Sequence, residues 1–301
     1  KYYKLFKKVV QKMQKKYICT IGIFDGVHVG HQKLISVVKN IAEKNCLSSL
    51  IYTFDKGTKI NKNYIYPLDT KIQLLKNFQV NKVCVLKFDK IKFLSPQQFF
   101  EKFMVNKNVS IVVVGEDFKF GKDASGDVEL LCKLSNQANV TTFVLKDFYV
   151  KIKNNLYSVS SSLIRRKILE CKFDEVELLL GRKYFINGKI VGGLGLAKKL
   201  GFPTINFLPE KNLLVPKGVI AGFCKIKNSI YPSVANFGFK PTVEGAKFVV
   251  EIHIIDRKIF VDNEEVFFRP IKKIRDEQRF GSIKDLTRQV KKDIFTAKKV
   301  L

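Results

Sequence analysis

Apolar positions along the first half of the chain follow two alternating patterns. Continuous apolar runs, which predict buried strands, occur at residues 17–24, 48–54, 82–88, 109–115 and 140–148. Segments with apolar residues at helical spacing separate these runs, at residues 31–45, 68–78, 95–105 and 127–139. Strands joined by helices predict a parallel sheet covered on both faces, with ligands bound beyond the carboxyl ends of its strands.

The second half of the chain follows a different pattern. Residues 156–182 predict two short helices that are separated near Cys171 and Lys172. Short β-like runs then alternate with Gly, Pro, Asn and Asp, at residues 185–191, 219–226, 231–237, 247–255 and 264–268. These runs indicate an antiparallel barrel or sandwich, and residues 282–301 predict a closing helix. We therefore expect an α/β protein with two domains, residues 1–182 and residues 183–301.

The composition changes this picture little. The formal net charge of +28 attracts polyanions, from ATP to RNA. Lysine is spread over almost every segment, which indicates a compositional bias, so we do not expect nucleic acid as a partner. The six cysteines form no CxxC or Cys/His cluster, which argues against zinc and a disulfide framework. The chain shows neither a membrane-length apolar run nor the pattern of a secretion signal, so we expect a cytoplasmic protein without membrane contact.

The first candidate chemistry lies in the stretch IGIFDGVHVGH, where the first predicted strand gives way to a helix. Gly22, Gly26 and Gly30 let the backbone turn tightly and approach a ligand closely. The amides at the start of the next helix form an anion site, beside which His28 and His31 lie three residues apart. Each histidine alone is more simply a satisfied polar residue at a helix start. The HxGH pattern directly after GxFDG favours phosphate chemistry, in which imidazoles stabilise charge on phosphorus and its leaving group.

Two further groups suit the handling of ATP. Arg165 follows a serine run at a predicted helix start, where its guanidinium and the serine hydroxyls can bind phosphates, although a solvated surface arginine is the simpler alternative. Thr204 and Asn206 alternate along a predicted strand after Pro203, so both point to one side. Their oxygens are of the hard type that Mg²⁺ prefers. Ordinary turn and strand residues would give the same short pattern.

A carboxylate in an apolar strand is the last candidate. Glu251 lies in VVEIHII, and burial would raise its pKa and make it a better general base. The alternative is an outward-facing glutamate, with Val250 and Ile252 as the inward pair. Alternation along the strand does not decide between these.

Several motifs in this chain together resemble one family. GIFDGVHVGH is similar to the nucleotide-binding motif of bacterial bifunctional riboflavin kinase/FMN adenylyltransferases, also called FAD synthetases. GEDFKFG and the GD that follows resemble the family's GxDFxFGxxxxGD loop, SSSLIR resembles SSTxIR, and LGFPTINF resembles LGFPTANL. YPLDTKIQLL, LLLGRKYFINGKIVGG, EIHI and IRDEQRFGSIKDL match further segments in the same order, so the resemblance covers nearly the whole chain.

This resemblance implies a Rossmann-like nucleotidyltransferase domain followed by a β-barrel riboflavin kinase domain with a terminal helix. The kinase would use ATP and Mg²⁺ to phosphorylate riboflavin to FMN, and the first domain would transfer AMP from ATP to FMN, giving FAD and pyrophosphate. In the family, the glutamate matching Glu251 removes the proton from the terminal ribityl hydroxyl, which attacks the γ-phosphate. The partners would be small-molecule substrates, bound by a monomer or weak oligomer.

The resemblance also assigns site residues. It implies catalytic roles for His28, His31, Arg165 and Glu251, and metal binding by Thr204 and Asn206. The residues implied to bind nucleotide or phosphate are Gly22, Phe24, Asp25, Gly26, Gly30, Ser160, Ser161, Ser162, Gly195, Lys198, Gly201 and Pro203. The residues implied to bind the flavin are Phe54, Asp117, Phe118, Phe120, Arg275, Glu277 and Phe280.

Departures from the family motifs leave alternatives open. The Pro-His-Pro that usually follows Phe54 is missing, and Ala197-Lys198 replaces Gly-Arg. Ile205 replaces an alanine, and residues 260–263 replace the usual Asp-Leu-Tyr-Gly turn. These changes allow a second hypothesis, an FMN adenylyltransferase whose kinase domain is degenerate or only holds flavin. A basic RNA-binding protein on this scaffold is a third hypothesis, which rests on charge alone.

Overall fold

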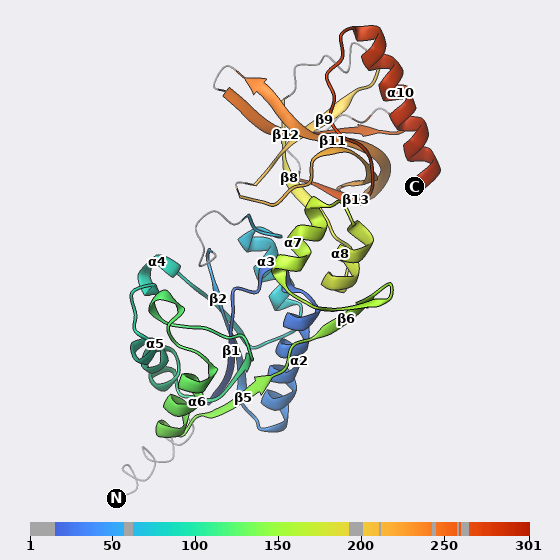
Figure 1. Ribbon diagram of the computed structural model, residues 1–301. Coiled ribbons are helices and arrows are strands. Elements are labelled where there is room, and N and C mark those ends of the chain that lie inside the picture. Colours follow the sequence, from blue (N-terminus) through green and yellow to red (C-terminus); the bar gives the residue numbers. More distant parts are fainter. Residues whose placement is uncertain are drawn as a thin grey trace, which may run out of the picture. The chain divides into compact units, whose positions relative to one another are not determined.

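The computed structural model describes residues 16–56, 63–192, 201–210, 212–242, 245–257, 259 and 265–301, and in residues 239–242 and 245–247 the backbone only. Its contacts divide the chain into two compact units. The first unit comprises Lys1–Lys62 with Leu68–Val159, and the second comprises Asn63–Pro67 with Ser160–Leu301. Figure 1 shows both units, with many of their elements labelled.

A five-stranded parallel sheet with strand order β3-β2-β1-β4-β5 forms the centre of the described part of the first unit. Its strands are β1 (Tyr17–Ile21), β2 (Ser48–Phe54), β3 (Lys82–Leu86), β4 (Val109–Gly115) and β5 (Thr141–Leu145). The longer helices between them are α2 (Val29–Lys44), α3 (Leu68–Lys76), α5 (Pro96–Phe103) and α6 (Val128–Gln137). Shorter elements are η1 (Asp25–Val27), α4 (Phe88–Ile91), η2 (Val105–Lys107) and η3 (Lys122–Ala124).

Helices cover both faces of this sheet (Figure 1). Successive residues of β1 show why, because Ile18 packs with Val38 of α2 on one face. Cys19 packs with Phe99 of α5 on the other face. Strands that are buried on both sides need the continuous apolar runs of the sequence. The fifth strand is shorter than predicted, because β5 ends at Leu145 and the chain then forms an antiparallel pair, β6 (Tyr149–Ile152) and β7 (Asn155–Ser158).

The second unit begins with two helices. These are α7 (Ser161–Leu169) and α8 (Phe173–Leu180), and Cys171 lies between them with a left-handed φ of 55°. This confirms the predicted break near Cys171 and Lys172. Gly181, with φ 67°, ends α8 in the left-handed conformation that glycine adopts without strain.

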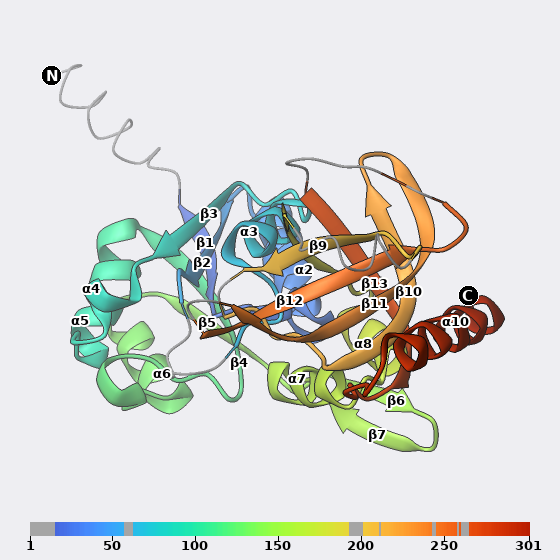
Figure 2. The ribbon, with the colours of Figure 1, turned by 90° about the horizontal axis from the view of Figure 1, so that it is seen from above.

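A closed antiparallel barrel follows, in the order β10-β11-β12-β9-β8-β13. The strands are β8 (Ile186–Val191), β9 (Thr204–Pro209), β10 (Gly218–Ile226), β11 (Ser229–Thr242), β12 (Gly245–Ile254) and β13 (Glu265–Arg275). Alternate residues of β12, including Val250 and Ile252, are buried. The amphipathic helix α10 (Ile283–Val300) packs Ala297 against Val219 and Val234 on the outside of the barrel (Figure 2).

The predicted fold class is confirmed, and the antiparallel strands of the second unit form a closed barrel and not a sandwich. Ser282 caps α10, because its side chain accepts a hydrogen bond from the backbone N–H of Asp285. Among the described residues, no helix combines the length and the apolar character that crossing a membrane requires.

Candidate active sites

The two motif histidines lie together at the start of α2. His28 is the residue before the helix, and its Nδ1 accepts a hydrogen bond of 3.3 Å from the backbone N–H of His31. The two imidazole rings stack with centroids 3.5 Å apart, and the ring of Phe24 meets His31 edge-on at 5.1 Å. Because His28 is only 6% exposed, its ring is fixed in place beside the positive end of a 16-residue helix.

The loop that carries His28 has an unusual backbone. Gly26 has φ 78°, and two residues other than glycine, Phe24 and Val27, have φ of 51° and 42°. Positive φ is costly for a β-branched residue such as Val27, so surrounding contacts must hold this turn. Gly30 is also constrained, since a Cβ there would lie 3.3 Å from the His28 ring. The loop therefore has one tightly determined shape at the sheet edge where the motif predicted a ligand.

A buried lysine that the sequence analysis missed supports the same loop. Lys71 of α3 is 5% exposed, and its Nζ donates hydrogen bonds to the carbonyls of Ile23 at 3.0 Å and Phe54 at 2.8 Å. Burial lowers the pKa of this amine from 10.5 to about 8, and the charges of Asp25 and Asp55 oppose that shift. The signal was available in the sequence, because Lys71 lies between Leu68 and Leu75 on the apolar stripe of its helix.

The residues of the GEDFKFG segment have different environments. Asp117 is exposed, and Phe118 is half-buried and stacks on Phe120 with centroids 5.6 Å apart. Phe120 is 5% exposed and packs on Phe99 in the core of the first unit, which makes it a support for the loop. Phe54 is half-buried at the end of β2. Asp117, Phe118 and Phe54 thus keep accessible surface for a ligand.

The serine and arginine motif opens the first helix of the second unit. Ser160 caps α7 through a 3.2 Å hydrogen bond from the backbone N–H of Leu163 to its Oγ. Arg165 is half-buried, and its Nε donates to the carbonyl of Asn63 at 3.0 Å. Ser162 is exposed and Ser161 is half-buried. A capped helix start with hydroxyls and a guanidinium is a suitable anion site, although the Asn63 carbonyl already accepts one hydrogen bond from Arg165.

The predicted kinase residues meet on the outer face of the barrel. Glu251 on β12 is paired in register with Asn206 on β9 and with Asn236 on β11. Directly paired residues of neighbouring strands share a face, so the carboxylate stands between two amides. Val250 and Ile252 point inward, so Glu251 faces outward, which was the alternative in the sequence analysis. Glu251 is nevertheless half-buried among polar side chains of its own face. Asn236 gave no signal in the sequence.

The oxygen of Asn206 bears on metal binding. Asn206 is 8% exposed, and its Oδ1 has no hydrogen-bond partner among the residues that the structure describes. A buried carbonyl oxygen without a donor is costly, so a cation or a water molecule held by a cation suits this atom. Thr204, two residues earlier on the same face, is half-buried. Hard oxygens such as those of Thr204 and Asn206 are of the type that Mg²⁺ accepts beside its own waters and substrate phosphates. In the described ranges no three His, Cys, Asp or Glu side chains cluster as metal ligands.

The third histidine of the chain supports this strand. His253 is paired in register with Thr204, and its Nδ1 lies 3.0 Å from the carbonyl oxygen of Pro203. Because a carbonyl can only accept, Nδ1 carries the proton in this contact. The ring of Phe202 meets His253 edge-on at 5.8 Å. His253, which the sequence analysis did not single out, thereby fixes the Pro-Thr-x-Asn strand.

The predicted flavin residues after β13 form a braced loop. The guanidinium of Arg275 makes hydrogen bonds of 2.8–3.1 Å to the carboxylate of Asp293 on α10 and of 2.9 Å to the carbonyl of Asp276. It also lies 5.7 Å from the ring of Phe280. A Cβ at Gly238 would collide with the Glu277 carboxylate, so this side chain lies against β11. Arg275 therefore anchors the loop, while Glu277 and Phe280 are placed beside the barrel face.

The remaining predicted nucleotide positions are Gly195, Lys198, Gly201 and Pro203. Gly195 and Lys198 are outside the described residues. Gly201 has φ 85° with open space around it, and Pro203 is half-buried.

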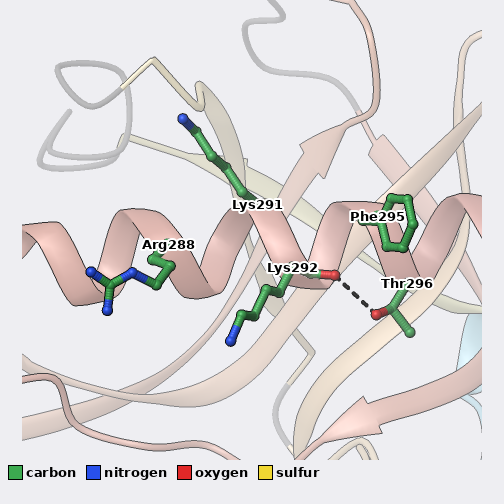
Figure 3. A pocket seen from close by; sticks show the side chains of 5 residues that line it. All are labelled: Arg288, Lys291, Lys292, Phe295 and Thr296. Atoms are coloured by element: carbon green, nitrogen blue, oxygen red, sulfur yellow. Dashed lines mark hydrogen bonds between the residues drawn. The ribbon is translucent and has the colours of Figure 1, made fainter.

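A hollow of about 460 Å³ lies on the surface of α10 (Figure 3). It is lined by Arg288, Lys291, Lys292, Phe295 and Thr296. All five belong to one helix face and none is a predicted site residue, so this hollow is separate from the candidate chemistry.

Comparison with known proteins agrees with this architecture. A parallel sheet with a glycine- and histidine-rich loop after its first strand, followed by a closed barrel that pairs Glu251 with Asn206, is the architecture of a two-domain nucleotide-dependent transferase. A family model described as FAD synthetase matches residues 10–162, and one described as riboflavin kinase matches residues 180–301. The chain belongs to the bifunctional riboflavin kinase/FMN adenylyltransferase family, and the family prediction is confirmed.

Individual relatives match over nearly their whole length. The bifunctional riboflavin kinase/FMN adenylyltransferase of Buchnera aphidicola subsp. Acyrthosiphon pisum is 31% identical, covering 96% of this chain and 95% of the relative. The protein of the same name from Bacillus subtilis is 32% identical, covering 95% and 92%. A crystal structure described as a macrolide-efflux protein from Streptococcus pneumoniae has a TM-score of 0.81 at 26% identity, covering 95% of both chains.

Proposed function

We propose that this chain makes both flavin cofactors, phosphorylating riboflavin to FMN in residues 183–301 and adenylylating FMN to FAD in residues 1–182. The observation that carries the two-activity proposal is the register of Glu251 between Asn206 and Asn236. A half-buried carboxylate between two amides, one of which has an oxygen without a partner among the described residues, is better explained by an active kinase domain than by a degenerate one.

In the adenylylation half, ATP phosphates bind at the start of α2. The amides there and the imidazoles of His28 and His31 bind the phosphate oxygens. A phosphate oxygen of FMN attacks the α-phosphorus of ATP, the bond to the β-phosphate oxygen breaks, and pyrophosphate leaves. The histidines stabilise the charge on the phosphorus and on the leaving group, so positioning and electrostatics suffice without a covalent intermediate. Arg165 and the Ser160–Ser162 hydroxyls bind the nucleotide phosphates in this reaction.

In the kinase half, Glu251 removes the proton from the terminal ribityl hydroxyl of riboflavin. The hydroxyl oxygen then attacks the γ-phosphorus of ATP, and ADP leaves. Thr204 and Asn206 would hold Mg²⁺, which neutralises charge on the phosphates when bound. His253 keeps their strand in place through the Pro203 carbonyl. Gly195, Lys198, Gly201 and Pro203 belong to the nucleotide-binding segment of this half.

The flavin contacts follow from exposure. Asp117, Phe118 and Phe54 offer accessible surface in the first half, with Phe120 supporting them from the core. Glu277 and Phe280 contact riboflavin in the second half, where Arg275 fixes their loop. We expect the enzyme to act in the cytoplasm on small-molecule substrates, as a monomer or weak oligomer.

Supplying riboflavin, ATP and Mg²⁺ tests the proposal directly, with separation of the flavins by chromatography. We expect FMN first and FAD second. If FMN yields FAD but riboflavin yields nothing, the chain is an FMN adenylyltransferase with an inactive kinase half. If folded protein converts neither substrate, the proposal is wrong.

A further inference from the structure

We propose that Lys71 is a positioning residue for adenylyl transfer, whose buried ammonium group fixes the phosphate-binding loop between β1 and α2. This inference rests on the proposed adenylylation at His28 and His31. It gives a role in the reaction to a residue of α3, a helix to which no substrate contact is assigned.

The geometry ties three elements at one point. Lys71 reaches from α3 to the carbonyl of Ile23, two residues past the end of β1, and to the carbonyl of Phe54, the last residue of β2. The Ile23 carbonyl also accepts a 3.0 Å hydrogen bond from Thr53 Oγ1. Ile23 immediately precedes the strained turn at Phe24, Gly26 and Val27. The position of this carbonyl therefore sets where the turn begins and where His28 enters the helix.

The electrostatics indicate a function beyond packing. Two carboxylates face the ammonium group, Asp25 of η1, which is 3% exposed, and Asp55 after β2. Their attraction does not offset burial, because the pKa of Lys71 remains lowered to about 8. Keeping this amine charged at neutral pH thus reduces stability, whereas a leucine or methionine on the apolar stripe of α3 would not carry that cost. A buried charge kept at such a cost, next to a predicted anion site, is the pattern of a functional group.

Positive charge at this point has a direct use. The ammonium group counters the carboxylate of Asp25, which would otherwise repel the phosphates of ATP from the same loop. Loss of the charge should therefore both loosen the turn and weaken phosphate binding. Because a displacement of about 1 Å in a positioning element can cost about 100-fold in rate, we expect Lys71→Met to lower kcat/KM for FMN adenylylation by about 100-fold.

Lys71→Met and Lys71→Arg test the inference, with Lys76→Met as the matched control because Lys76 is an exposed lysine of the same helix. Riboflavin phosphorylation by the same preparations is the internal control and should stay within twofold of the parent chain. Lys71→Met should show the about 100-fold lower kcat/KM for FMN adenylylation, mainly because KM for ATP increases. Lys76→Met should leave both reactions unchanged.

The pH dependence separates positioning from a merely structural role. As pH rises through about 8, the Lys71 ammonium loses its proton, and kcat/KM for adenylylation should fall in the parent chain. Lys71→Arg keeps its charge, so its relative activity should stay level up to pH 9.5. Burial disfavours the charged amine, so the unfolded chain holds more protons than the folded chain between about pH 8 and 10.5, and the contribution of Lys71 to stability rises there. Between about pH 8 and 10.5, kcat/KM for adenylylation should therefore fall while the contribution of Lys71 to the free energy of unfolding rises.

The outcomes are distinct. The inference is wrong if kcat/KM for adenylylation falls equally at alkaline pH in the parent chain, Lys71→Met and Lys71→Arg. It is also wrong if Lys71→Met is as active as Lys76→Met. If Lys71→Met does not fold, as judged by circular dichroism, the inference is tested by comparing kcat/KM at alkaline pH in the parent chain and in Lys71→Arg. If the parent chain makes no FAD from FMN and ATP, the proposed function has failed instead.

Discussion

At the scale of single residues, the two halves depend on different chemistry. Glu251 moves a proton, whereas His31 stabilises charge on phosphate without itself needing to exchange one. Each side chain lies in a different compact unit of the chain. Substituting either residue should therefore affect one reaction and leave the other intact.

We expect Glu251→Gln to lower kcat for riboflavin phosphorylation by about 100- to 10,000-fold, the usual worth of a general base. Glutamine keeps the shape and the register between Asn206 and Asn236 but cannot accept a proton. The measurement is initial-rate kinetics with riboflavin, and FAD formation from supplied FMN is the control. Equal loss of both reactions would contradict the role assigned to Glu251.

We expect His31→Ala to lower kcat for FMN adenylylation by about 100- to 1,000-fold, comparable to removing one donor that stabilises a transition state. His31 is the better choice than His28, because His28 also caps α2 and losing a cap costs about 1 kcal/mol of stability. Riboflavin kinase activity of the same variant is the control. An adenylylation rate that does not change would remove the imidazole from the mechanism.

At the scale of elements, positioning contacts at strand and helix ends shape both sites. Lys71 connects α3 to the ends of β1 and β2, His253 holds the start of β9, and Arg275 connects the end of β13 to α10. In each case a charged or polar side chain from one element makes a hydrogen bond to a backbone carbonyl or a carboxylate near the end of another element or within it. These contacts join residues far apart in sequence.

The sequence predicted the elements better than it predicted these contacts. Continuous apolar runs predicted β1, β2 and β4 because both faces of those strands are buried. The β6–β7 pair was missed, because its strands are largely exposed, with Leu156 67% exposed, and lack a clear apolar alternation. Lys71, Asn236 and His253 were missed because a single polar residue in an apolar pattern does not reveal its partner in space. Glu251 was predicted because a known motif surrounds it.

For the Pro203 contact, we expect His253→Ala to raise KM for ATP in riboflavin phosphorylation by about tenfold with little change in kcat. Without the imidazole, nothing described holds the Pro203 carbonyl, and the Thr204 and Asn206 oxygens lose their fixed position. His253→Asn, whose amide can donate to the same carbonyl, should restore part of the affinity. A KM equal to that of the parent chain would show that the contact has no part in nucleotide binding.

For the contact between β13 and α10, we expect Asp293→Ala to lower the free energy of unfolding by about 3 kcal/mol. The side chain of Asp293 is only 5% exposed, and its removal leaves Arg275, whose side chain is 19% exposed, without its carboxylate partner. Lys298→Ala is the matched control on the same helix, because its ion pair with Asp256 is exposed and should be worth less than about 1 kcal/mol. Denaturant unfolding followed by circular dichroism measures both, and equal effects would contradict the buried character of the Arg275 pair.

At the scale of the whole molecule, the two reactions share one intermediate. FMN is the product of the kinase half and a substrate of the adenylylation half, and Glu251 and His31, the residues substituted to block each reaction, lie in different compact units. FMN can therefore pass through solution between two different molecules.

This independence predicts complementation. Glu251→Gln alone should make no FAD from riboflavin, and His31→Ala alone should stop at FMN, yet an equal mixture of the two should convert riboflavin fully to FAD after a lag. FMN should accumulate first and then decline, as followed by chromatography over time, because the intermediate must leave one molecule before it binds another. Doubling the concentration of Glu251→Gln should shorten the decline without changing the initial rise of FMN. A mixture that stalls at FMN, although Glu251→Gln converts added FMN, would mean that the intermediate does not leave the molecule that made it.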